Sequence, residues 1–151
     1  MNLTDVYREI VLEHSRHPRN RGALEAATLV QNGSNPSCGD ELELSLQIED
    51  DRILAARFAG VGCAISQASA SLMTVLLEGK TIPQALELAT DFHAMLRGAP
   101  PSERLGEASA LQGVARLHAR VKCATLPWQT LQVALEALKQ DSGEERSATL
   151  E

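Results

Sequence analysis

The sequence contains very few aromatic side chains and no excess of positive charge. Aromatic residues make up only 3% of the 151 residues, so flat platforms for stacking nucleic-acid bases are not expected. The formal net charge of −6 argues against binding to a phosphate backbone. No apolar run approaches the roughly 20 residues that span a bilayer. We therefore expect a protein that binds neither nucleic acid nor membranes.

Signals for export and for several common enzyme classes are absent as well. The N-terminal residues have neither the basic nor the apolar region of a signal peptide, so we expect a cytoplasmic protein. The sequence has no G-x-x-x-x-G-K, G-x-S-x-G or H-E-x-x-H pattern, which excludes the common nucleotide-binding, hydrolase and metalloprotease signatures.

Cysteine is scarce, but its number is informative. The chain has three cysteines, which are Cys38, Cys63 and Cys123. In a reducing compartment an odd number of cysteines favours thiols or metal ligands over disulfides. The alternative is three separate buried thiols, because a free cysteine packs like a small apolar side chain.

Hydrophobic spacing in the first half of the chain predicts a helix followed by strands. Leu42, Leu44 and Leu46 alternate with polar residues, which indicates a strand with one buried face. In order, the pattern predicts a helix from Leu3 that ends near 17–22, a short strand at 27–31, a turn at 32–37, a strand at 42–48 and a returning strand at 53–58. Three strands with helices on either side indicate an α+β domain.

The second half of the chain is predicted to be helical. In order, we expect a helix at 64–78 rich in Ala and Ser, a helix from Thr81 to Thr90, mixed short pieces at 91–113, a short helix or approach segment at 114–122, and a last helix that begins at 123–126 and ends near 140. The polar residues 141–151 are expected to form a disordered tail, which leaves one domain over residues 1–140.

Each cysteine lies beside a predicted break in secondary structure. Cys38 and Asp40 flank Gly39 at a loop-to-strand junction, where glycine lets the backbone turn. Cys63 directly precedes a predicted helix, and Cys123 lies at the predicted start of another. A helix N-terminus favours thiolate over thiol. Cysteines of a hydrophobic core show no such preference for element ends, so we predict one shared site.

Three thiolates and a carboxylate match the ligands of tetrahedral Zn²⁺. Because Asp40 is a weaker zinc ligand than a thiolate, we expect a site that can open and release one cysteine. The ligands outweigh the charge of the ion, and Arg120 and Lys122 are candidates for electrostatic support. The alternative for these two residues is an ordinary solvated surface.

The histidines are weaker candidates for ligands. His14 and His17 lie on or after the first helix, where surface positions are expected. A helical approach would point His118 away from Cys123, and His93 is an equally weak candidate.

At this point the sequence resembles the U-type iron–sulfur assembly family, which includes IscU and the N-terminal part of NifU. The resemblance covers about residues 5–138. It rests on the segments 7–14 with 17–22, Asn35-Pro36-Ser37-Cys38-Gly39-Asp40, 60–66 with 68–71, and 120–126 with Trp128. Lys122 stands where IscU-type scaffolds carry a histidine, and the segment 91–113 is longer, which are both typical of the SufU branch.

The resemblance implies a fold and an activity. The implied fold is a three-stranded antiparallel sheet with helices packed on one face. The implied activity is that of a zinc-bound sulfur acceptor for a PLP-dependent cysteine desulfurase of the SufS type, with Cys38 as the catalytic acceptor and Asp40, Cys63 and Cys123 retaining the metal. Downstream iron–sulfur assembly proteins would be further partners.

Two other hypotheses stay open. The same residues could hold a [2Fe–2S] cluster on a scaffold, with a carboxylate or an outside ligand completing the iron coordination. The chain could also be a domain that merely folds around zinc, in which case removal of the metal unfolds it.

Overall fold

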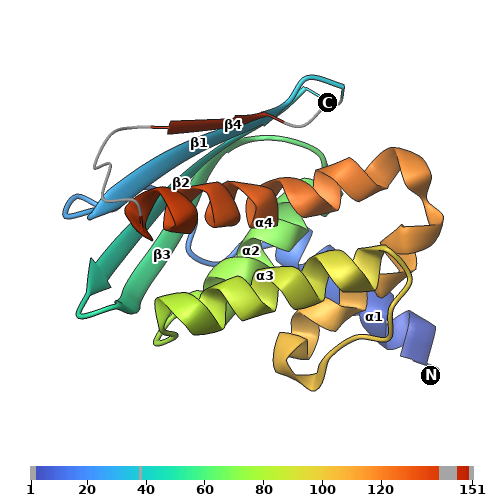
Figure 1. Cartoon of the computed structure of the whole chain (residues 1–151). Coiled ribbons are helices and arrows are strands. Elements are labelled where there is room, and N and C mark those ends of the chain that lie inside the picture. Colours follow the sequence, from blue (N-terminus) through green and yellow to red (C-terminus); the bar gives the residue numbers. More distant parts are fainter. Residues whose placement is uncertain (1–2, 38, 140–145, 150–151) are drawn as a thin grey trace.

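A sheet and a layer of helices make up the computed structural model, with the helices on one side of the sheet (Figure 1). The structure describes residues 3–37, 39–139 and 146–149. The elements are α1 (Leu3–Arg16), β1 (Leu29–Asn35), β2 (Asp40–Glu49), β3 (Arg52–Val61), α2 (Ala64–Leu77), α3 (Ile82–Leu96), the 3₁₀ segment η1 (Glu103–Arg116), α4 (His118–Lys139) and β4 (Arg146–Thr149).

Strands β1, β2 and β3 form the predicted three-stranded antiparallel sheet. β2 lies in the middle, where Leu44 is paired with Gln31 of β1 and with Phe58 of β3. Leu44 and Leu46 are fully buried, whereas the intervening Glu43 is exposed. The predicted α+β class, the period-two pattern of β2 and the placement of the helices on one face are therefore confirmed.

β1 is longer than predicted. The turn-forming residues 32–35 were expected to leave the sheet, but they pair with β2 as far as Asn35 opposite Asp40. Gly33 lies within this strand, where α4 approaches closely. A Cβ atom on Gly33 would lie 2.1 Å from the Thr130 hydroxyl oxygen, so only glycine lets the helix pack here.

α3 also continues beyond its predicted end. The Thr81 side chain accepts a hydrogen bond from the Gln84 amide at 3.3 Å, which confirms the predicted start. The helix was expected to end at Thr90, but it runs to Leu96 because Phe92, Met95 and Leu96 are buried in the core. Most of the remaining mixed segment forms η1.

α4 begins earlier than predicted. Residues 118–122 were assigned to a separate piece because proline is best tolerated in the first turn of a helix. Instead Pro127 lies inside a continuous helix that starts at His118. Pro127 has no N–H to donate to the carbonyl oxygen of Cys123, four residues earlier. The expected position of Cys123 at a helix start is therefore wrong.

The sheet has a fourth strand that the sequence pattern does not predict. β4 pairs in parallel with β1, from Gln31 beside Arg146 to Ser34 beside Thr149. The prediction of a disordered tail is therefore wrong for residues 146–149, which form a strand. The outer edge of β1 offers backbone groups for pairing, and such pairing requires no apolar side-chain pattern. Residues 140–145, 150 and 151 lie outside the described residues, and the domain boundary at 140 stays a prediction.

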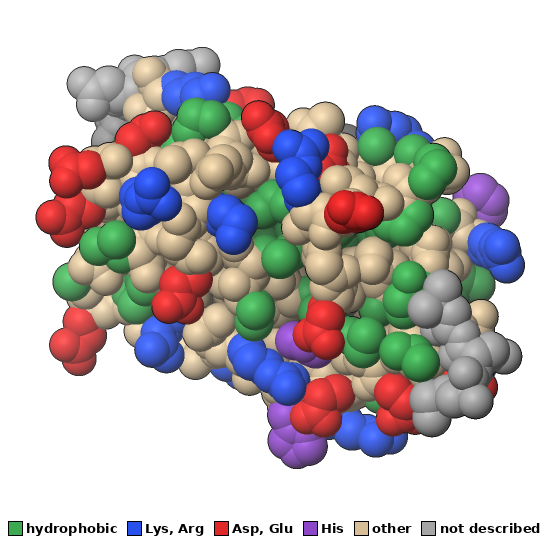
Figure 2. Space-filling model, turned by 90° about the horizontal axis from the view of Figure 1, so that it is seen from below, with side chains coloured by type: hydrophobic (Ala, Val, Ile, Leu, Met, Phe, Trp, Pro, Cys, Tyr) green, Lys and Arg blue, Asp and Glu red, His purple; other side chains and the backbone are tan. Residues whose placement is uncertain are grey.

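Two buried aromatic side chains join α3 to α4 within the core. The rings of Phe92 and Trp128 are stacked with their centroids 4.5 Å apart, and both side chains are fully buried. On the surface seen from below, acidic and basic side chains are interspersed (Figure 2). Among the described residues no helix is long and apolar enough to cross a membrane.

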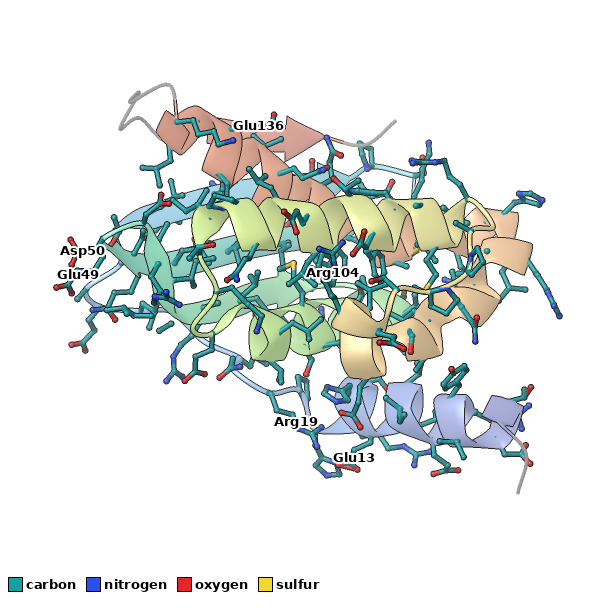
Figure 3. All side chains as sticks on the ribbon, turned by 60° about the horizontal axis from the view of Figure 1, so that its bottom comes forward. Glu13, Arg19, Glu49, Asp50, Arg104 and Glu136 are labelled. Carbon is teal, nitrogen blue, oxygen red and sulfur yellow. The ribbon has the colours of Figure 1, made fainter. Side chains whose placement is uncertain are left out.

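His14 connects α1 to α2, so its predicted surface position is wrong. Its side chain is buried, and Nδ1 lies 2.7 Å from the Ser71 hydroxyl oxygen. That oxygen also accepts the Arg19 amide, so the hydroxyl hydrogen can be donated to a neutral His14. Arg19 in turn forms an ion pair with Glu13 of α1, with 3.8 Å between Nη2 of Arg19 and Oε1 of Glu13 (Figure 3).

We predict that His14 makes the folded state sensitive to acid. Burial, and then the charge of Arg19, lower the pKa of His14 below 6.5, and these effects outweigh the opposing effect of Glu107. The unfolded chain therefore takes up a proton first as the pH falls through 6.5, and the free energy of unfolding decreases. The change His14→Gln should flatten this decline in urea titrations. His17→Gln, at an exposed position, is the control, and an equal slope for wild type and His14→Gln would contradict the prediction.

Candidate metal centre

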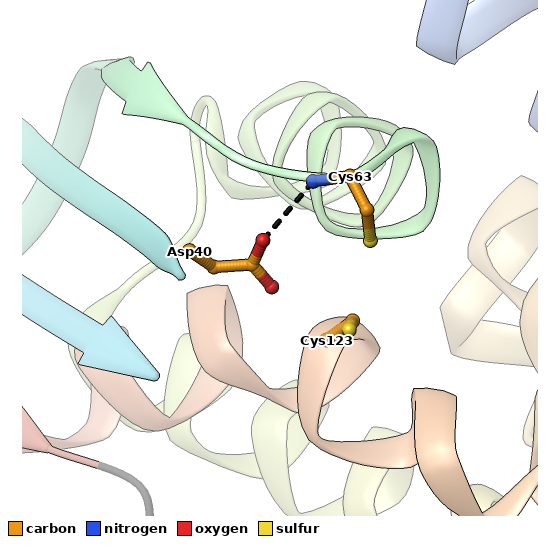
Figure 4. Close-up of side chains that lie close together, drawn as sticks. All are labelled: Asp40, Cys63 and Cys123. Carbon is orange, nitrogen blue, oxygen red and sulfur yellow. Dashed lines mark hydrogen bonds between the residues drawn. The ribbon is translucent and has the colours of Figure 1, made fainter. Parts of the chain in front are cut away.

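Asp40, Cys63 and Cys123 converge although they are far apart in the sequence. Each offers one ligand atom, and these atoms lie within 4.8 Å of one another. Asp40 begins β2, Cys63 directly precedes α2, and Cys123 lies within α4 (Figure 4). The sheet, α2 and α4 therefore meet at this point.

Asp40 is buried, and its two carboxylate oxygens have different surroundings. Oδ1 accepts a hydrogen bond from the Cys63 amide at 3.0 Å. Oδ2 is buried and has no hydrogen-bond partner among the described residues. Figure 4 shows the carboxylate turned toward the two cysteines. A buried carboxylate oxygen without a donor is costly, and a cation beside the two sulfurs would satisfy it. The residues therefore fit a metal ion.

Cys63 occupies the N-cap position of α2, which confirms its predicted place before a helix. Its side chain is partly buried and makes no capping hydrogen bond, so the sulfur is available at the positive end of the helix dipole. The sulfur is therefore placed to act as a metal ligand.

Two glycines let the backbone reach this arrangement. Gly39 has φ = +72°, which is the turn expected between Cys38 and Asp40. At Gly62 a Cβ atom would lie 2.3 Å from the Ser66 hydroxyl oxygen and 2.8 Å from Asp40 Oδ1. A larger residue at position 62 would therefore clash with the Ser66 side chain and the Asp40 carboxylate, both of which would have to shift.

Cys123 is fully buried inside α4, so the helix-terminus effect expected for it does not apply. The nearby cation is Arg120, one turn earlier on the exposed surface of the helix. A hydrogen bond to Cys123, together with the charges of Cys63 and Cys123, raises the pKa of Arg120. Lys122 is half-buried and lines a groove on the neighbouring surface.

Small residues of α2 let the cysteine-bearing part of α4 pack closely. The Ser69 hydroxyl donates to the carbonyl oxygen of Ala124 at 2.6 Å and accepts the indole N–H of Trp128 at 3.1 Å. The backbone of α4 therefore lies close against the small side chains of α2. The role of Ser69 in holding the residue after Cys123 was not predicted, although the serine and alanine content of α2 was its signal.

Residues 6–142 match the family model described as the NifU-like N terminal domain. The chain belongs to this family. The NifU-like domain of this protein is 41% identical to the zinc-dependent sulfurtransferase SufU of Bacillus subtilis, over 87% of this chain and 90% of that protein. It is also 41% identical to an iron–sulfur cluster assembly scaffold protein IscU of Streptococcus pyogenes, over 89% of this chain and 85% of that protein.

Solved structures agree with this assignment. A crystal structure from Fervidobacterium islandicum, described as an assembly scaffold protein for the SUF system, superposes on this NifU-like domain with a TM-score of 0.81. The two are 37% identical, and the superposition covers 89% of this chain and 99% of that one. The predicted family membership is therefore confirmed.

Cys38 and three of the histidines are not among the residues that the structure brings together at the centre. Cys38 lies outside the described residues, so its roles as ligand and sulfur acceptor stay predictions. On its C-terminal side, the Gly39 amide donates to the carbonyl oxygen of Asn35 at 2.9 Å. His17 and His118 are exposed, whereas His93 is partly buried, and burial lowers its pKa.

We predict that Gly62→Ala weakens metal binding by displacing Asp40. The added methyl group would meet the carboxylate and Ser66, so the affinity for Zn²⁺ should fall by about tenfold or more. A competition titration with a chromophoric chelator measures this change. Gly113→Ala is the control, because a Cβ atom there would have no neighbour within 4 Å. Equal affinity in all three proteins would show that Gly62 has no part in positioning the site.

Proposed function

We propose that this protein is a zinc-dependent sulfurtransferase, which accepts persulfide sulfur from a cysteine desulfurase for iron–sulfur cluster assembly. The supporting observation is the convergence of Asp40, Cys63 and Cys123 within 4.8 Å, with one buried carboxylate oxygen that has no donor among the described residues. The similarity to a named zinc-dependent sulfurtransferase supports the same activity.

Asp40, Cys63 and Cys123 would hold the zinc, with Cys38 as the fourth ligand. Bound zinc keeps cysteine sulfurs deprotonated at neutral pH. The Cys63 amide orients the Asp40 carboxylate, and Arg120 offers positive charge beside Cys123. Because thiolates and a carboxylate together outweigh the charge of Zn²⁺, this guanidinium would stabilise the loaded site. Lys122 remains a second candidate for this role.

The chemical step assigned to the chain is the transfer of one sulfur atom to Cys38. The Cys38 thiolate attacks the terminal sulfur of a persulfide on the desulfurase. A sulfur–sulfur bond forms at Cys38, the bond to the desulfurase cysteine breaks, and that cysteine leaves as a thiolate. The exchange needs no external oxidant or reductant. The donor would be a PLP-dependent enzyme of the SufS type in the cytoplasm, and downstream assembly proteins would receive the sulfur.

Desulfurase turnover tests the proposal. Wild-type protein should stimulate turnover several-fold, and Cys38→Ala should abolish this stimulation because no acceptor thiolate remains. Ser37→Ala, at the exposed residue that directly precedes Cys38 in the sequence, is the matched control and should stimulate fully. Mass spectrometry after the reaction should find one added sulfur atom on Cys38. If Cys38→Ala stimulates as well as the wild type, the sulfurtransferase proposal fails.

A second candidate function is supported by the similarity to IscU scaffold proteins. In that case a [2Fe–2S] cluster would be a cargo, built on the same residues and transferred onward. Anaerobic reconstitution followed by visible absorption distinguishes the two functions. A stable cluster that passes to an apoprotein would favour the scaffold. Unfolding on removal of zinc, without any response of the desulfurase, would instead indicate a purely structural metal site.

A further inference from the structure

A broad groove lies beside the candidate metal centre. It has a volume of about 1240 Å³ and runs between α1, the end of α3, the end of η1 and the start of α4. Pockets for small molecules have volumes of about 300–1,000 Å³. The groove is therefore better suited to a segment of polypeptide than to a metabolite.

The groove offers apolar contacts to an occupant. Its lining includes apolar side chains from five elements, which are Val11, Leu12, Ile65, Met95, Val114 and Val121. Several of these side chains are only partly buried in the chain alone, as the example of Val121 shows. An occupant that buries them must present apolar side chains of its own.

The charge of the groove is opposite to the charge of the whole chain. Four of its lining residues are positively charged, and among the described residues that line it none is acidic. The charged residues are Arg8, Arg97, Arg116 and Lys122. The whole chain carries a net charge of −6, so this concentration of positive charge is local. A partner that matches the groove is therefore acidic as well as apolar.

We propose that this groove is a docking site for an acidic amphipathic segment of another protein. An amphipathic helix lays its apolar side in such a groove, and its Asp and Glu side chains then meet the basic rim. The acidic turn that carries Glu49 and Asp50 does not fill the groove of the same molecule, because it lies at the opposite end from α1 (Figure 3).

The groove and the metal centre share two elements. Ile65 follows Cys63 by two residues at the start of α2, and Val121 and Lys122 directly precede Cys123 in α4. A partner segment in the groove is thus held next to both cysteines. The docking proposal stands independently of the sulfurtransferase proposal, because it concerns binding and not the chemistry at Cys38.

A designed peptide tests the groove with the full chain. The probe is a fluorescein-labelled helix of Leu and Glu, with Leu at positions i, i+3, i+4 and i+7. Fluorescence polarisation should show saturable binding that weakens as salt is added. A matched peptide with Lys in place of Glu should bind at least about tenfold more weakly. In NMR spectra, the changes in amide chemical shift on adding the peptide should be largest in α1, at the end of α3 and at the start of α4.

Charge-reversed variants locate the binding. Arg8→Glu combined with Arg116→Glu should weaken binding of the acidic peptide by about tenfold or more. Arg57→Glu combined with Lys80→Glu changes the net charge equally outside the groove and should leave the affinity unchanged. Equal binding of the two peptides, or an equal loss in both double variants, would overturn the proposal. Self-association in sedimentation that the groove variant abolishes would also overturn it, by making a second copy the occupant.

Discussion

The candidate metal centre depends on one hydrogen bond that joins the start of a strand to the start of a helix. Cys63 is the N-cap residue of α2, so its amide has no hydrogen-bond partner within the helix. This amide donates instead to one carboxylate oxygen of Asp40. This contact fixes the carboxylate and leaves its second oxygen facing the two sulfurs (Figure 4). An amide at the helix N-terminus, which has no partner within the helix, thus orients the Asp40 side chain of the sheet.

The third member of the centre is held by different means. Cys123 lies in a helix interior, and its position follows from how α4 packs on α2 and β1. Ser69 binds the backbone of α4 directly after Cys123, and Gly33 lets the next turns of the helix lie against β1. A small residue on each neighbouring element therefore permits the close packing that brings the second sulfur to the first.

The local pattern of the sequence was sufficient for the parts of the fold that depend on it. The alternation of Leu42, Leu44 and Leu46 predicts β2, and the helix predicted directly after Cys63 indicates the break at the site. The convergence of Asp40, Cys63 and Cys123 was inferred from their placement beside breaks and from the family resemblance, and the structure brings these three together.

The parts that were missed depend on contacts distant in sequence. Residues 32–35 have turn chemistry, but pairing with β2 keeps them in a strand. Pro127 suggested a helix start, but burial on α2 and β1 stabilises the helix through it. The burial of His14 follows from Ser71, which is remote in sequence, and no periodicity shows such a contact.

The register of β2 has a consequence for how this family can vary in length. Asp40 lies on the same side of the strand as Leu42, Leu44 and Leu46, because side chains two residues apart share a face. One inserted or deleted residue between Asp40 and Leu46 would turn either the carboxylate or the leucines outward. Natural length changes in this part of the chain should therefore fall in the turns, where they alter neither the core nor the metal ligand.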